Sequence, residues 1–193
     1  MLRVFFKKNK RIKSRMIINP KAKKIALSGL FATFSLLFSF MGHYLVIPMF
    51  LGFKLDISDF PIFTSTLLFG PSYGYVTLIV VNFIKMFFFS TSGWPGFFMR
   101  ITSIISVFFF GLYFKYKKRL IFYSTLSILI LNLIKVPLSC LFWVIFKSMP
   151  IDQLFPLIFS TILPYNLVKS IINTFISIYF YKNIRELIND KKN

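Results

Sequence analysis

The chain has 193 residues, of which 56% are hydrophobic and 20% aromatic, and its mean hydropathy is +0.73. A soluble domain has about 45–50% apolar residues even with glycine included, so this composition excludes an ordinary soluble globule and indicates a polytopic membrane protein. The net charge of +19 would suit nucleic acid, but the basic residues gather in separate clusters between apolar runs, and we expect no nucleic-acid partner.

The apolar runs predict an all-α fold, a bundle of six transmembrane helices in a lipid bilayer. We expect helices at about 25–46, 61–70, 73–90, 97–114, 120–146 and 157–181. Most have close to the 20 residues that cross a hydrocarbon core of about 30 Å. The second is shorter, so it is either tilted or incomplete. Proline and glycine at the boundaries of these segments mark helix ends rather than interiors.

Three regions follow from these segments: a basic arm at 1–24, a membrane domain at 25–182 and a basic tail at 183–193. Ten of the 24 Lys and Arg lie in the arm. The positive-inside bias places clustered basic residues in the cytoplasm. Both termini are therefore expected on the cytoplasmic side.

The loops support the same orientation. Residues 115–119 (KYKKR) carry four basic residues, whereas Lys54 and Lys147 are the only ones in the loops expected on the opposite side. Those opposite loops hold Asp56, Asp59 and Asp152, three of only five acidic residues.

Four basic residues lie from Lys182 onward, and the remaining four fall within apolar segments. Three of these last four belong to an N-x-x-K pattern. The pattern occurs at 82–85, 132–135 and 166–169. Residues three apart share a helix face, so each tetrad forms one polar stripe. For the first two, the simplest interpretation is that asparagines join helices while lysines extend to the interface. The third is harder to explain this way, because no acidic residue is expected in the neighbouring helices to pair Lys169.

The polar groups expected inside the membrane indicate the class of ligand. Almost no carboxylate is expected there, which disfavours a proton relay or a cation path. Amide and ammonium donors suit a neutral ligand rich in carbonyl groups, or an anionic one. Trp94, Tyr44 and Phe60 lie near the outer loops, where a planar ring would stack. The single histidine, His43, and the single cysteine, Cys140, predict neither a metal site nor an internal disulfide.

Motifs for energy coupling are missing from the sequence. There is no GxxxxGK[ST] loop, so ATP is not the direct fuel of this chain, and no inverted repeat marks a self-sufficient transporter. These features favour a binding subunit that depends on a separate motor. A membrane enzyme would need a nucleophile with a base, or an acid pair, and a structural adaptor would need no ligand at all.

Two stretches carry a family resemblance. The first stretch resembles the signature of the substrate-binding S components of energy-coupling factor (ECF) vitamin transporters. It covers residues 53–85 and reads FKLDISDFPIFTSTLLFGPSYGYVTLIVVNFIK. The second stretch is similar to the last helix of the riboflavin-specific members. It covers residues 162–182 and reads ILPYNLVKSIINTFISIYFYK. The resemblance covers about residues 24–185.

The resemblance implies a six-helix bundle that binds riboflavin from outside a bacterial cell, in the plasma membrane, and is not an enzyme. It also implies docking on a membrane coupling protein driven by two ATPase subunits, and no cofactor. Asn132, Asn166 and Lys169 match residues that hold the flavin. Asp56 and Trp94 complete the expected substrate-binding set.

Small residues near the start of the first helix match the surface that packs on the coupling protein. The expected partner-binding residues are Ala26, Ser28, Gly29 and Ala32. Packing within the bundle explains such small-xxx-small patterns equally well.

The chain departs from the family pattern after the Gly-Trp-x-Gly of the third loop. Phe97 and Arg100 stand where an acid and an asparagine are expected. Arg100 would suit a phosphate. An S component for another vitamin or flavin, such as FMN, pantothenate or folate, therefore stays as the alternative.

Overall fold

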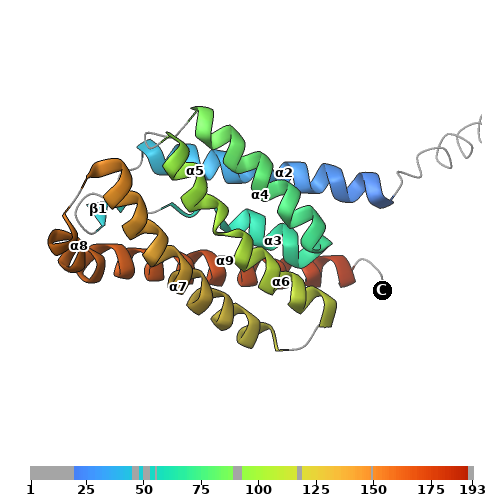
Figure 1. Cartoon of the computed structure of the whole chain (residues 1–193). Helices are drawn as coiled ribbons and strands as arrows, with labels where there is room; N and C mark the ends of the chain where they lie inside the picture. The colour runs from blue at the N-terminus through green and yellow to red at the C-terminus, as the bar shows by residue number, and fades with distance from the viewer. Residues whose placement is uncertain are drawn as a thin grey trace, which may run out of the picture.

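The structure is a computed structural model that describes residues 20–44, 48–49, 53–54, 56–88, 93–116, 119–148 and 150–190. In chain order the elements are α2 (Pro20–Tyr44), β1 (Pro48–Met49), β2 (Phe53–Lys54), α3 (Phe60–Phe69), α4 (Pro71–Phe88), α5 (Gly93–Ile101), α6 (Ile104–Tyr116), α7 (Leu120–Lys147), α8 (Ile151–Leu157), a π-helical turn (Ile158–Ile162) and α9 (Leu163–Asp190) (Figure 1). The two short strands pair antiparallel. The all-α class predicted from the sequence is confirmed.

Five helical stretches within the described residues are long and apolar enough to cross a membrane. They are Pro20–Gly42, Pro71–Phe88, Phe97–Tyr116, Leu120–Phe142 and Asp152–Glu186. The remaining apolar helix, α3, has only ten residues, as the short second segment predicted.

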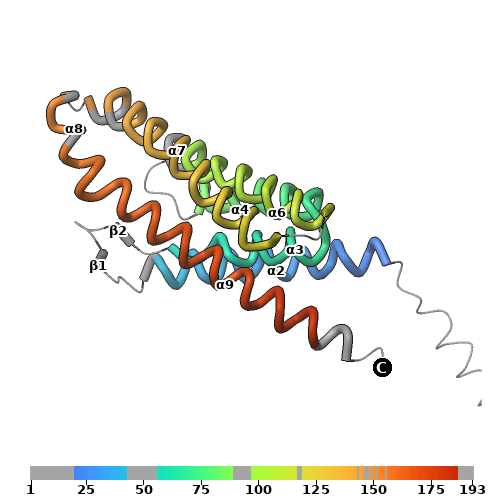
Figure 2. The backbone as a smooth tube through the Cα atoms, turned by 90° about the horizontal axis from the view of Figure 1, so that it is seen from below, coloured from blue at the N-terminus to red at the C-terminus, as the bar shows by residue number. Residues whose placement is uncertain are grey.

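Helix α3 forms the centre of the bundle. It packs against α2, α4, α6 and α9 (Figure 2), and every side chain from Phe60 to Leu67 is buried. A helix that is apolar on all sides is stable only when protein or lipid surrounds it. The short length of α3 is therefore compatible with a membrane position because its neighbours enclose it.

A sharp turn joins α3 to α4 at Gly70 and Pro71. Gly70 has a φ of 107°, a conformation that residues with a Cβ rarely adopt, and Pro71 begins the next helix at a position that needs no N–H donor. Close packing follows, because a Cβ at Gly111 of α6 would lie 2.7 Å from the Cβ of Pro71. The Gly-Pro pair thus sets the tight approach of α3, α4 and α6.

Two of the expected helices contain breaks. The segment expected at 97–114 divides into α5 and α6, where the Thr102 hydroxyl donates to the Met99 carbonyl (2.6 Å). The segment expected at 157–181 is longer, because α8 and the π-helical turn lead directly into α9. Pro164 has no N–H to donate to the preceding turn, and the wider π turn lies just before it.

The start of α2, the end of α9 and the α6–α7 connection lie at one end of the bundle, whereas β1, β2 and α8 lie at the other (Figures 1 and 2). Helix α2 begins at Pro20 and α9 ends at Asp190. The helices therefore extend beyond the expected domain limits of 25 and 182. Most of the basic arm, residues 1–19, lies outside the described residues.

Candidate functional site

An ionic cluster joins the segment before α3 to α4 and α9. The Lys169 ammonium lies 3.1 Å from Asp56 Oδ2 and 3.6 Å from Asp59 Oδ2. Lys85 of α4 lies 4.0 Å from the same Asp56 oxygen and donates to the Ser58 hydroxyl. We use the name ionic cluster for Asp56, Asp59, Lys85 and Lys169.

This cluster corrects two expectations from the sequence. The expectation that no acidic residue pairs Lys169 was wrong, because the segment expected in an outer loop folds into the bundle and Asp59 is only 8% exposed. The interpretation that Lys85 extends to the interface was also wrong, since Lys85 is 1% exposed. A buried ammonium needs an opposite charge and hydrogen bonds, and Asp56 and Ser58 provide them.

Backbone hydrogen bonds hold the acidic segment in this position. Asn173 of α9 accepts from the Phe60 amide (2.9 Å) and donates to the Asp56 carbonyl (3.1 Å). Ser35 of α2 donates to the Ser58 carbonyl (2.6 Å). Because one buried asparagine satisfies both a donor and an acceptor of the segment, the two carboxylates are fixed beside α9 rather than left at the surface.

The two lysines determine the charge state of Asp56. Burial alone would raise the pKa of its carboxyl group, but attraction by Lys169 and Lys85 and hydrogen bonds from Ser58 outweigh burial and hold the pKa well below its usual range. Asp56 is therefore ionised at neutral pH.

The two predicted amides lie on the facing helices α7 and α9. Asn132 Nδ2 donates to the Ile128 carbonyl (2.8 Å) and to the Ser170 hydroxyl (3.0 Å). Its Oδ1 is buried and has no hydrogen-bond partner among the described residues. Asn166 Nδ2 donates to the carbonyl of Ile162, in the π-helical turn (2.9 Å). Asn132 thus retains an unsatisfied acceptor in the protein interior.

Two further cations act on this region electrostatically. Lys135 of α7 is 8% exposed, and its charge is repelled by Lys169 and attracted by Asp59 and Asp56. Arg100 of α5 is attracted by the same two carboxylates. All four basic residues expected within the apolar segments therefore interact electrostatically with the same two acids.

The candidate aromatic residues do not join this region as a group. Trp94 belongs to α5, but its side chain and that of Tyr44 lie outside the described residues. Phe60 contacts other aromatic residues. Its ring packs against Phe38 and Phe180, with centroids 5.0 and 5.3 Å away.

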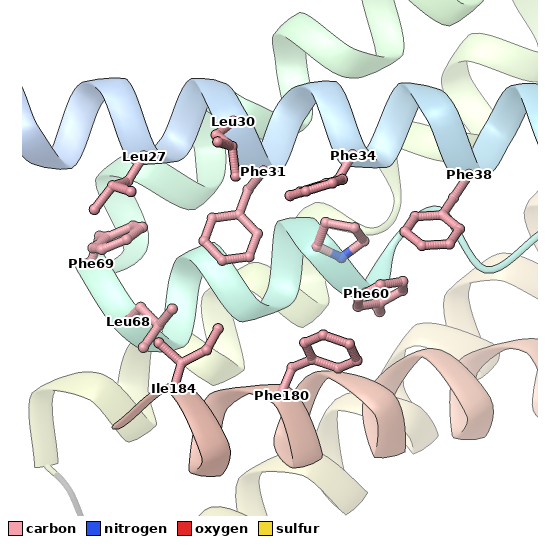
Figure 3. A pocket seen from close by; sticks show the side chains of 11 residues that line it. Leu27, Leu30, Phe31, Phe34, Phe38, Phe60, Leu68, Phe69, Phe180 and Ile184 are labelled. Atoms are coloured by element: carbon pink, nitrogen blue, oxygen red, sulfur yellow. The ribbon is translucent and has the colours of Figure 1, made fainter. Parts of the chain in front are cut away.

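Phe60 instead lines an apolar cavity of about 380 Å³ between α2, α3 and α9 (Figure 3). Leucine, isoleucine, phenylalanine and one proline form its wall. Such a wall offers no hydrogen bond to a polar ligand, so this cavity is not the candidate site.

The predicted partner-binding residues divide between two environments. Ser28 is buried and lies 3.5 Å from the Ser65 hydroxyl of α3, and Ala32 packs against the core. Ala26 and Gly29 are exposed on α2. Only the second pair is available for contact with another protein.

Sequence reasoning did not assign a site role to Asp59, Lys85 or Asn173. The signal for the first two was present, because both belong to motifs already recognised, KLDxSDxP and N-x-x-K. Asn173 had no such signal, since its partners are 113 and 117 residues away in the chain. No group of three metal-ligating side chains occurs within the described ranges.

Taken together, the site presents one free carbonyl acceptor, several N–H donors and four cationic groups against two carboxylates. Its chemistry is recognition of a polar ligand.

Comparison with known proteins agrees with this chemistry. Residues 23–181 match the family model of the ECF transporter, substrate-specific component. A solved structure described as the S component of a bacterial ECF transporter has a TM-score of 0.67 and 23% sequence identity, and the match covers 87% of this chain and 98% of that chain. No curated protein sequence matches. The solved structure shows the same fold, and because the family model spans most of the sequence, this chain belongs to the substrate-specific components of ECF transporters.

Proposed function

We propose that the chain is the riboflavin-binding subunit of an ECF-type transporter and delivers the vitamin for uptake across a bacterial plasma membrane. The family consists of transport subunits rather than enzymes, and it acts with a membrane coupling protein and ATPase subunits. The choice of riboflavin rests on the two sequence stretches at 53–85 and 162–182, and on the chemistry of the amides.

The observation that carries the proposal is the buried acceptor of Asn132. The pyrimidine edge of a flavin presents an N–H between two carbonyl groups, so it needs one acceptor flanked by donors. Asn132 Oδ1 supplies the acceptor. Asn166 and Lys169 retain N–H groups beyond those already bonded. A buried site of this kind discriminates strongly, because a ligand without the matching groups leaves it unsatisfied.

Binding is measured by titrating riboflavin into the purified protein in mild detergent and following quenching of tryptophan fluorescence, with the visible spectrum as a check for copurified flavin. We expect saturable quenching at stoichiometric flavin. Asn132→Ala should raise the Kd at least tenfold, which corresponds to about 1.4 kcal/mol. Asn82→Ala is the matched control, because Asn82 is a buried asparagine of the same N-x-x-K pattern on α4.

A folded protein that ignores riboflavin would refute the vitamin assignment and leave the family assignment intact. The ligand would then be sought among other vitamins. Equal effects of the Asn132 and Asn82 substitutions would refute the assigned role of Asn132.

The remaining assignments follow from the family and the charge pattern. The exposed pair Ala26 and Gly29 on α2 is the proposed contact with the coupling protein. Both termini are proposed to be cytoplasmic. The basic clusters of the sequence flank the start of α2, the end of α9 and the α6–α7 connection, and these element ends lie at one end of the bundle.

A further inference from the structure

The apolar cavity between α2, α3 and α9 is long and narrow. Its α2 wall runs from Leu27 at one end to Phe38 at the other (Figure 3), and this separation corresponds to about 16 Å along a helix. A volume of about 380 Å³ spread over this length gives a mean cross-section of about 24 Å². A helix with its side chains is about 10 Å across and would need about 80 Å². The cavity therefore suits one extended chain rather than a helix.

The cavity is a groove that is open at the surface of the bundle. Its floor is the start of α3, where Phe60 and Pro61 are buried. Along its rims, Leu30 and Phe34 of α2 and Phe180 of α9 are exposed. Both rim helices lie within stretches that are long and apolar enough to cross a membrane. A molecule that fills the groove therefore enters it from the hydrocarbon core of the bilayer.

The chemistry and length of the groove indicate what fills it. Its wall has only apolar side chains, and an apolar cavity does not hold ordered water. An apolar space that stays unfilled also loses van der Waals contacts along its lining. In a bilayer the apolar molecule at hand is a lipid acyl chain. The length of about 16 Å is close to half of a hydrocarbon core about 30 Å thick, which is the depth of one leaflet.

Positive charge lies at the Leu27 end of the groove. Lys23 and Lys24 precede Leu27 by one helical turn and extend the same helix face. Both are exposed, and α2 contains no acidic residue. Ile184 of α9 lines the same end (Figure 3). Its exposed neighbours in the chain are Lys182, Asn183, Arg185 and Glu186, which together add one positive charge.

We propose that this groove binds one anionic phospholipid, with an acyl chain along the apolar cavity and the headgroup phosphate beside Lys23 and Lys24. Lysines at the end of a membrane helix attract anionic headgroups, and an ammonium pairs with a phosphate by charge-assisted hydrogen bonds. A zwitterionic lipid offers the same chain without a net negative charge, so it binds more weakly. The proposal is independent of which vitamin the chain binds.

The test measures lipid binding to the full-length protein in mild detergent by native mass spectrometry. The two lipids are phosphatidylglycerol and phosphatidylcholine with identical acyl chains. We expect one tightly bound phosphatidylglycerol, with a Kd at least fivefold lower than that of phosphatidylcholine. Lys23→Gln/Lys24→Gln should remove most of this difference. Leu30→Trp, which enlarges a side chain at the rim of the groove, should raise the Kd of both lipids at least fivefold.

Two control variants make the same kinds of change away from the groove. Lys115→Gln/Arg119→Gln removes two exposed charges at the same end of the bundle, and Leu129→Trp enlarges an exposed leucine of α7. Neither should change either Kd more than twofold. All four variants alter exposed side chains, so their thermal unfolding in detergent should match that of the wild type.

Three outcomes would overturn the proposal. Equal Kd values of the two lipids for the wild type would refute the headgroup contact. Equal effects of Leu30→Trp and Leu129→Trp would show that the acyl chain does not lie in the groove. A protein dimer that Leu30→Trp dissociates would make the groove an interface between two copies of the chain. Failure of riboflavin binding, by contrast, would refute the proposed function and leave the lipid site standing.

Discussion

Substitution of Lys169 alone would not separate its role in the ionic cluster from its proposed role in ligand binding. As the centre of the ionic cluster it neutralises Asp56 and Asp59, and as a proposed flavin contact it offers a further N–H. A loss of ligand binding in a Lys169 variant would therefore not by itself identify a binding residue. Stability has to be measured separately.

We predict that Lys169→Met lowers the free energy of unfolding by about 3 kcal/mol, because breaking its buried ion pairs leaves the Asp59 carboxylate without an ion pair among the described residues. Thermal unfolding in detergent measures the change. The double variant Lys169→Met/Asp59→Asn should recover part of the loss, since it removes the carboxylate that Lys169 pairs while Asp56 keeps its ion pair with Lys85. A wild-type melting temperature for the single variant would contradict the structural role.

Part of this site was predictable from local sequence and part was not. The N-x-x-K pattern brought Asn132, Asn166 and Lys169 into consideration because residues three apart share a helix face. The partners of Lys169 were missed because a polar segment of this kind is normally expected at the surface. The hydrogen bonds of Asn173 and Ser35 hold this segment inside, and no periodicity relates Asn173 to partners more than 100 positions away.

At the level of elements, the end of α3 is a boundary that could be predicted from the sequence. The Gly-Pro pair at its end gave the correct limit, since both residues have strong backbone constraints. The break between α5 and α6 had no comparable signal. There an otherwise apolar helix is interrupted, and the Thr102 hydroxyl donates to a backbone carbonyl. Whether a side chain competes with the backbone for such a hydrogen bond depends on tertiary context.

The close packing of α3, α4 and α6 makes Gly74 a sensitive position. An added Cβ would clash with the Thr66 side chain and lie 3.0 Å from Val107 Cγ1. We predict that Gly74→Ala lowers the free energy of unfolding by about 1–3 kcal/mol, the usual range for overpacking. Thermal unfolding in detergent is again the measurement.

The matched control is Gly29→Ala on α2, where nothing lies within 4 Å of the added Cβ. Alanine favours a helix over glycine by up to about 1 kcal/mol, so this variant should be neutral or slightly more stable. Equal destabilisation by the two substitutions would contradict packing against α3 and α6 as the cause, because the added Cβ at Gly29 meets no other atom within 4 Å.

For the whole molecule, the fold brings together at one end the element ends that the sequence predicts to be cytoplasmic. The sequence predicts cytoplasmic termini from the clustering of basic residues. The start of α2, the end of α9 and the α6–α7 connection lie at one end of the bundle (Figure 1). The buried charges lie nearer the opposite end, since Asp56 follows β2 closely and Lys169 is only two turns into α9. A ligand from outside would therefore reach the polar region first.

We predict that cysteine labelling in intact cells will show the α8 end of the bundle outside and the termini inside. In a Cys140→Ser background, Gln153→Cys in α8 should react with a membrane-impermeant maleimide from outside. Lys115→Cys, at the exposed end of α6, should react only after the cells are permeabilised. Phe175→Cys, on the exposed apolar face of α9, is the control and should stay unlabelled in both states because lipid surrounds it. The reverse pattern for the first two variants would place the termini outside, and the polar region would then open toward the cytoplasm, which is incompatible with capture of an external vitamin.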